Sequence, residues 1–202
     1  IPNDYYDADG FLVAAYPIEY EARVIQALPD TATILVDPHF QATGADHHNT
    51  WHALLRKIDV FMPSEDELVG FSEITPKENI REYIQYLKEI SHIGPNVVGV
   101  KLGQRGVLVY NRQEDVTYHV PAYVEDRVID VTGCGDTFCG GFLSKFLQTG
   151  DVFTSAVCGV ASASLNLEDY GVIHNFSTNK MRAMQRFDFL MKTLDRNEQV
   201  IQ

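Results

Sequence analysis

Residues 130–142, with the sequence DVTGCGDTFCGGF, combine closely spaced glycines with two carboxylates. Gly133 and Gly135 leave backbone N–H groups unobstructed at the expected start of a helix, where unpaired donors and the helix dipole favour an anion. Asp136 lies among these donors and could act as a general base. We interpret the run as a phosphate-handling site. The structural alternative is a tight strand-to-helix turn in which Asp136 only complements the helix dipole.

Short β-rich runs alternate with segments of helical period along the chain, which predicts parallel strands connected by helices. The expected strands are residues 11–15, 32–37, 58–62 and 97–102, and the expected helices between them are 18–28, 51–57 and 76–91. Ligands bind at the carboxyl ends of the strands in such sheets, so residues 62–64 and 131–133 are candidates for a site.

The second half of the sequence has a different pattern. Residues 107–110 and 116–120, joined by a polar segment, predict an antiparallel hairpin. The remaining expected helices are residues 137–148, 153–167 and 180–194. A run of small residues at 159–164 predicts close helix packing, and glycines inside a helix, as at Gly140 and Gly141, indicate close approach of backbone or ligand.

Composition limits the class of protein. With 202 residues, of which 45% are hydrophobic, the chain is expected to form one domain over residues 1–202. A net charge of -12 argues against nucleic acid as a ligand, and no apolar run has the length of a membrane span. Three cysteines without CxxC spacing fit a reducing, cytoplasmic compartment. Because the first residue is Ile1, we expect the domain to be N-terminally incomplete.

Residues 130–142 resemble the C-terminal signature of the ribokinase-like (PfkB) carbohydrate kinase family, D-T-x-G-A-G-D-x-F followed by x-G-G-F. Residues 101–107 are similar to the T/K-L-G-x-x-G strand end that contacts the nucleotide, and residues 63–67 match a further motif in the family's order. The resemblance implies a three-layer α/β/α fold with a mostly parallel central sheet and a small antiparallel hairpin. It runs from about Ala32 to Gly171, so the family's N-terminal third, with most sugar contacts and the β lid, is expected to be absent.

The resemblance implies transfer of the γ-phosphoryl group of ATP to a hydroxyl of a sugar, nucleoside or related small molecule. Asp136 would take the hydroxyl proton, and the amides of Gly133, Cys134 and Gly135 would hold the transferring group. Positioning and charge stabilisation are what this chemistry needs. The implied partners are the small-molecule acceptor and a second copy of the chain, through the family's lid.

Five residues are candidates for nucleotide binding. Lys101, Gly103 and Gly106 stand where the family contacts nucleotide phosphates, and the hairpin that follows could wall an adenine pocket. A solvated strand end is the alternative for Lys101, and Arg105 is expected on the surface. Ser162 and Gly171 belong to a segment that resembles the family's second adenine-side element, although small helical residues also serve plain packing.

Four residues are candidates for metal binding. The family usually has N-x-x-E where this chain has Ser64 and Glu67, and its glutamate organises Mg²⁺ through water. Ser-x-x-Glu is also a helix capping box, and the two roles are compatible. Asp130 and Thr132 resemble positions that bind a monovalent cation such as K⁺, with simple turn chemistry as the alternative.

Histidines 39, 47, 48 and 52 cluster near Asp46, and the i, i+4 spacing of the last two could bind a metal, but the polar segment favours an ordinary surface helix. Cys134 is either a thiol activated by the helix terminus or a small packed side chain.

Two other functions are compatible with the sequence. A noncatalytic kinase-like interaction module is suggested by Ser64, the acidic composition and the absent N-terminal third. The second is a vitamin-precursor kinase or ADP-forming dehydratase of the wider superfamily. The hairpin and the Gly-Gly-Phe ending at 140–142 nevertheless favour the sugar-kinase branch.

Overall fold

The computed structural model describes residues 1–201 except 15, 40, 42, 124–127 and 171–179. Within this part of the chain one sheet contains seven strands, which neighbour one another in chain order. The strands are β1 (Gly10–Ala14), β2 (Thr33–Asp37), β3 (Val60–Phe61), β4 (Val97–Lys101), β5 (Val107–Asn111), β6 (Val116–Val120) and β7 (Val200–Ile201). β1 to β4 are parallel, and β5, β6 and β7 each pair antiparallel with the strand before them.

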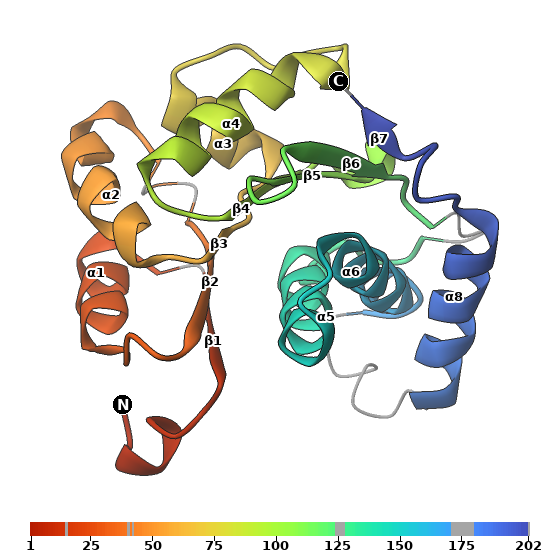
Figure 1. Ribbon diagram of the computed structural model, residues 1–202, viewed down its shortest axis with the longest axis horizontal. Coiled ribbons are helices and arrows are strands. Elements are labelled where there is room, and N and C mark those ends of the chain that lie inside the picture. The colour runs from red at the N-terminus through yellow and green to blue at the C-terminus, as the bar shows by residue number, and fades with distance from the viewer. Residues whose placement is uncertain (15, 40, 42, 124–127, 171–179, 202) are drawn as a thin grey trace.

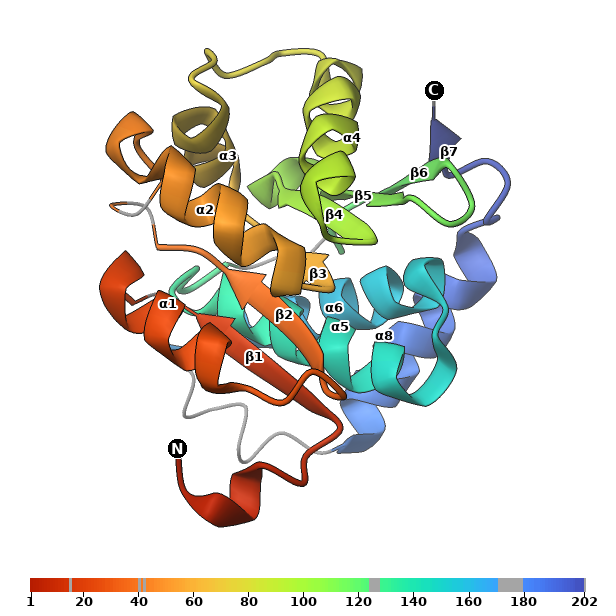
Figure 2. The ribbon, with the colours of Figure 1, turned by 60° about the vertical axis from the view of Figure 1, so that its left-hand side comes forward.

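Helices cover both faces of the sheet. One face carries α1 (Ile18–Ala27), α2 (His48–Leu54), α3 (Glu65–Ser72) and α4 (Ile84–Ile93), and the other carries α5 (Cys134–Thr149) and α6 (Val152–Asn166) (Figures 1 and 2). α8 (Lys180–Thr193) lies against α6 on the side opposite α5 (Figure 1). The three-layer α/β/α arrangement and the hairpin are therefore as predicted.

Two hydrophobic cores lie on the two faces of the sheet. In β2, Ile34 and Val36 belong to the core under α1 to α4, whereas Leu35 belongs to the core under α5 and α6. This alternation follows from the two-residue period of a strand, and it explains why a strand buried on both faces is a continuous apolar run. The largest buried side chains of the two cores are Trp51 and Tyr83 on one face and Phe142 and Phe153 on the other.

The two helices of the second face pack unusually close. A Cβ on Gly141 of α5 would lie 2.4 Å from the Ser162 hydroxyl of α6, and one on Gly159 would lie 2.7 Å from the Phe138 ring. Close packing of the small-residue run is therefore confirmed. Gly140, in contrast, faces open space, so the close approach expected at both glycines holds only for Gly141.

The expected elements differ from the structure in a few places. Residues 76–79 are not helical, because Asn79 caps a short 3₁₀ helix (Ile80–Tyr83) that precedes α4, with its Oδ1 accepting from the Arg81 N–H at 3.1 Å. α5 begins at Cys134, three residues before the predicted start, and β7 was not predicted. Across the described residues, no helix is long and apolar enough to cross a membrane.

Candidate active site

The glycine-rich run forms the turn into α5. Gly133 is the N-cap residue with a φ of +79°, a left-handed conformation that favours glycine. The first intrahelical bond joins the Thr137 N–H to the Gly133 carbonyl at 2.9 Å. The amides of Gly135 and Asp136 precede it and so belong to the unpaired donors of the helix terminus. Asp136 is exposed in this first turn.

Lys101 lies at this turn and not in solvent. Its ammonium donates to Asp37 Oδ2, and the two side chains are only 14% and 9% exposed. A Cβ on Gly135 would lie 3.2 Å from Lys101 Nζ, so the ammonium lies directly against the glycine turn. The ends of β2 and β4 and the start of α5 thus bring Asp37, Lys101 and Gly135 together, at the carboxyl edge of the parallel strands.

The ionisation of these groups follows from their burial. Burial raises the pKa of Asp37 to about 6, against the opposing effect of Lys101, and the Glu67 and Asp136 carboxylates raise it further. Burial alone would lower the pKa of Lys101, but Cys139, Asp37 and Glu67 outweigh it, and the pKa is raised. The charged form of Lys101 is therefore favoured, in a region that also contains the Asp37 and Glu67 carboxylates.

Sequence reasoning missed two carboxylates of this region. Asp37 ends β2, so the rule that sites lie at the carboxyl ends of strands could have identified it. Glu21 of α1 is fully buried, and burial raises its pKa to about 7, with an opposing hydrogen bond from the Tyr16 N–H and a further increase from Asp37 and Glu67. A buried glutamate inside an amphipathic helix gives no comparable signal in the sequence.

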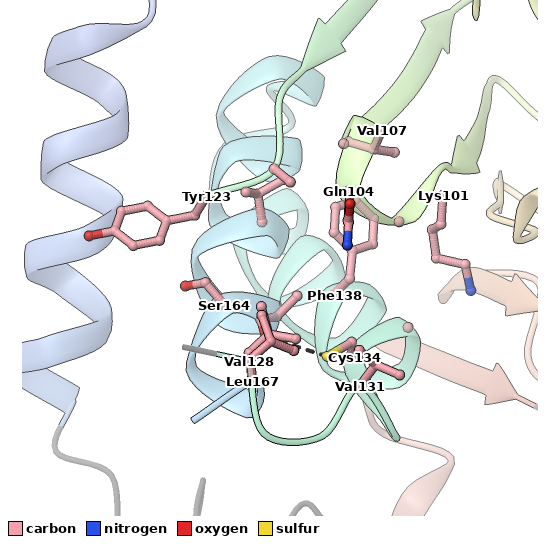
Figure 3. A pocket seen from close by; sticks show the side chains of 16 residues that line it. Lys101, Gln104, Val107, Tyr123, Val128, Val131, Cys134, Phe138, Ser164 and Leu167 are labelled. Carbon is pink, nitrogen blue, oxygen red and sulfur yellow. Dashed lines mark hydrogen bonds between the residues drawn. The ribbon is translucent and has the colours of Figure 1, made fainter. Parts of the chain in front are cut away.

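An apolar cavity of about 640 Å³ adjoins the turn (Figure 3). Lys101 lies on one side of it, and the side chains of Gln104, Cys134 and Ser164 also line it (Figure 3). Most of its walls are apolar or aromatic side chains from the hairpin, the residues before α5, and α5 and α6, namely Val107, Ala122, Tyr123, Val128, Val131, Phe138, Val160, Ala163 and Leu167. A cavity therefore lies beside the hairpin and the turn at 103–106, where the family resemblance implied an adenine pocket.

Both predicted glycines of that turn line the cavity. Gly103 has a φ of +58° and Gly106 a φ of +83°. A Cβ on Gly106 would lie 2.2 Å from the Val120 carbonyl oxygen, so only glycine fits there. Arg105 between them is only partly exposed, and its guanidinium bonds to Glu65 and to the Lys77 carbonyl, so the expectation of a plain surface residue was too simple.

The predicted adenine-side residues of α6 are placed differently. Ser162 donates to the Cys158 carbonyl at 2.8 Å and packs against Gly141, away from the residues that line the cavity. Its neighbours Ala163 and Ser164 line the cavity instead. Gly171 lies outside the described residues.

The first pair of metal candidates lies beside Lys101. Ser64 and Glu67 form the capping box of α3, in which the Ser64 N–H donates to Glu67 Oε2 at 2.6 Å. Ser64 also bridges to Lys101 in the sheet, and the Lys101 N–H donates to the Pro63 carbonyl at 2.9 Å. Ser64 and Glu67 therefore cap α3 and also lie close to Lys101.

The second pair belongs to a hydrogen-bonded turn. Asp130 Oδ1 accepts from the Thr132 N–H at 3.0 Å, and the Thr132 carbonyl accepts from Asn166 Nδ2 at 2.5 Å. Asn166 is a further residue that the sequence did not single out, and it ties this turn to the end of α6. Within the described parts of the chain, no three His, Cys, Asp or Glu side chains are grouped so that they could hold a metal.

The remaining candidates have structural roles. His48 Nε2 lies 2.7 Å from the Phe71 carbonyl oxygen, and its ring packs against the Phe71 ring, as expected for an ordinary helix. Burial raises the pKa of the Cys134 thiol, so this cysteine is not activated by the helix terminus. Asn166 Nδ2 lies 3.5 Å from Cys134 Sγ, which is consistent with a packed side chain.

Comparison with known proteins identifies the family of the chain. The family model for pfkB family carbohydrate kinases matches residues 2–179. Over 145 residues the chain is 28% identical to an ATP-dependent 6-phosphofructokinase of Thermoanaerobacterium thermosaccharolyticum, covering 69% of this chain and 42% of that protein. It is 26% identical over 147 residues to a cytidine kinase of Thermococcus kodakarensis, covering 72% and 50% of the two chains.

Solved structures give the same result for the fold. Arabidopsis thaliana ribokinase, complexed with ribose and ATP, superposes with a TM-score of 0.78 at 22% identity, over 94% of this chain and 60% of that chain. A Burkholderia thailandensis nucleoside kinase in complex with inosine gives 0.74 at 19% identity, over 92% and 57%. The chain therefore has a ribokinase-like fold and spans about half the length of the curated relatives. It belongs to the PfkB family of carbohydrate kinases.

Proposed function

We propose that residues 1–202 form, as one domain, the nucleotide-binding and catalytic part of an ATP-dependent kinase that phosphorylates a hydroxyl of a sugar or nucleoside. One observation carries the proposal: the Lys101 ammonium lies against Gly135 on one side of a mostly apolar cavity, and Asp136, the next residue after Gly135, is exposed. A pocket for the nucleotide base, an anion site and a candidate general base therefore lie next to one another.

The cavity suits the base of ATP, because its walls are mostly apolar and its polar groups are few. The triphosphate would extend from it towards Lys101 and the N-terminal amides of α5, which stabilise negative charge. Asp136 would accept the proton of the acceptor hydroxyl as its oxygen attacks the γ-phosphorus. The bond from that phosphorus to the β,γ-bridging oxygen breaks, and ADP leaves with the electron pair.

The residues present fit a Mg²⁺ ion held mainly by the nucleotide and water. Glu67 Oε2 accepts a hydrogen bond from the Ser64 N–H, which leaves the other carboxylate oxygen of Glu67 for a water molecule bound to Mg²⁺. When bound, Mg²⁺ neutralises charge on the transferring phosphates. Replacing Ser64 with Asn is expected to strengthen the dependence of activity on Mg²⁺, and an unchanged dependence would contradict a role for this pair.

A monovalent cation at Asp130 and Thr132 fits less well. The oxygens that would serve it already accept hydrogen bonds within the turn and from Asn166. Turn chemistry accounts for both residues, and no step is assigned to such an ion.

The names of the relatives support a sugar or nucleoside acceptor, and they include a ribokinase of Staphylococcus aureus that is 30% identical over 121 residues. The three cysteines are all free thiols, which supports a reducing compartment such as the cytoplasm.

The decisive experiment is the Asp136→Asn variant. Formation of ADP is measured with a panel of sugars and nucleosides, and ATP binding is measured separately by calorimetry. We expect turnover to fall by at least 100-fold while ATP affinity changes little, because Asn retains the size but not the basicity of Asp. Undiminished phosphorylation in the variant would refute the mechanism. ATP binding without turnover in the wild-type chain, for every acceptor, would favour the noncatalytic module.

A further inference from the structure

Lys101 is the cation of the glycine turn, and a lysine side chain has four rotatable bonds. The structure shows what restrains it. Asp37, at the end of β2, accepts from the Lys101 ammonium through Oδ2. The carboxylate is itself held from the far side by Cys139 of α5, whose Sγ lies 3.6 Å from the same oxygen. Cys139 is fully buried, so the carboxylate is backed by the protein core and not by water.

The arrangement leaves Lys101 free on one side only. Gly135 lies over the ion pair, with the position of a Cβ 3.2 Å from Lys101 Nζ and 3.7 Å from Asp37 Oδ2. Lys101 and Gly135 line the cavity, whereas Asp37 does not. The carboxylate therefore lies behind the ammonium, and the cavity lies in front of it.

We propose that Asp37 is a positioning residue that fixes the Lys101 ammonium against the Gly135 turn, where it binds a phosphate oxygen of the nucleotide. This inference rests on the proposed function. The physical reason is that an ion-paired lysine is held in place before the phosphate arrives, so less conformational freedom is lost on binding. Protein kinases use a lysine–glutamate pair in the same way, although on an unrelated fold. The raised pKa of Lys101 agrees with an ammonium that stays charged while buried.

The test is a comparison of ATP with adenosine, measured as competition against a fluorescent ATP analogue on the full chain. Asp37→Asn is expected to weaken ATP binding at least tenfold and to change adenosine binding less than twofold, because only ATP carries phosphates. The matched control is Asp115→Asn, which breaks the exposed pair between Lys88 of α4 and Asp115 of the hairpin turn and should leave both affinities unchanged.

A double-mutant comparison separates positioning from a general structural effect. Lys101→Met removes the group that Asp37 is proposed to hold, so adding Asp37→Asn to it should change ATP affinity less than twofold. If the single Asp37→Asn variant does not fold, Asp37→Glu replaces it, since the displaced carboxylate should still weaken ATP binding more than adenosine binding.

The inference is overturned if these Asp37 variants bind ATP as the wild type does, or lose ATP and adenosine affinity equally. A large further loss of ATP affinity in the Lys101→Met background also overturns it. In each of these cases the wild-type chain binds ATP and the proposed function stands. A wild-type chain that binds no ATP refutes the proposed function itself.

Discussion

The guanidinium of Arg105 donates to Glu65 Oε2 over 2.5 Å, which ties the turn that lines the cavity to the helix that carries Glu67. The same guanidinium donates to the Lys77 carbonyl at 2.9 Å, and the Tyr83 hydroxyl donates to the other oxygen of Glu65. Glu65 is therefore bonded from two sides. The turn at 103–106 and the first turn of α3 are held as one unit.

Replacing Arg105 with Ala should release this connection. We expect the free energy of unfolding to fall by about 1 kcal/mol, a modest value because the side chain is partly exposed. Urea unfolding measures it. Arg23→Ala, at an exposed position on α1, is the control and should be neutral. An equal change in both variants would show that the Arg105 contacts contribute nothing specific.

Replacing Glu21 with Gln should stabilise the protein at high pH but not at low pH. The pKa of Glu21 is raised from 4.5 to about 7 in the folded state, so the folded protein binds this proton more tightly than the unfolded chain. Its contribution to stability is full below pH 4.5 and is lost as the pH rises through 7. Gln keeps the acceptor for the Tyr16 N–H but has no charge to bury. The variant should therefore exceed the wild type by up to about 3 kcal/mol at pH 8 and match it near pH 4. Denaturant unfolding across this range tests the difference, and a gap that does not vary with pH would contradict it.

The neighbouring glycines of α5 should respond oppositely to alanine. Gly141→Ala places a Cβ 2.4 Å from the Ser162 hydroxyl, so we expect destabilisation by about 1–3 kcal/mol. Gly140→Ala meets no atom within 4 Å and should stabilise the helix by about 0.5–1 kcal/mol. Thermal unfolding of the two variants provides the comparison, with each serving as the control of the other. Stabilisation by both would mean that α5 and α6 are not in close contact here.

ATP should protect Cys134 from alkylation. Cys134 lines the cavity, whereas Cys139 is fully buried, and a Cys158→Ala background removes the third thiol. Because burial raises the pKa of Cys134, the unprotected rate should keep increasing with pH beyond the range in which an ordinary thiol ionises. Mass spectrometry of maleimide-treated protein should show labelling slowed several-fold by ATP. In denaturant, ATP should not change the rate of Cys134 labelling. If folded protein is labelled equally fast with and without saturating ATP, the nucleotide binds elsewhere.

The fold was predicted well because the spacing of hydrophobic residues indicates which segments are helices and which are strands. The strands and the last three helices lie within a few residues of their predicted bounds, whereas β7 is a two-residue strand with no periodic signal. The turn at 103–106 and the glycine run were identified because glycine spacing is visible in sequence. Whether Ser162 or its neighbour faces the cavity was not predictable, since one residue turns a helical side chain by about 100°.

Two of the contacts that sequence reasoning missed join residues far apart in the chain. Asp37 meets Lys101 across 64 positions, and Arg105 meets Glu65 across 40. No local pattern reports such a pair, and a charged residue at the end of a strand is compatible with solvent exposure. These two pairs are identified by their contacts in the structure and not by the local sequence.

The contact between Asp37 and Cys139 joins residues 102 positions apart. Contacts of such separation form late, because the entropy of closing a long loop must be met before they contribute. During synthesis Asp37 leaves the ribosome well before α5 exists, so for that interval its carboxylate lacks the partner that will back it. The Lys101 side of the cavity is thus assembled only when both halves of the chain have docked, and if the proposed function holds, nucleotide binding would report completed folding of the whole domain.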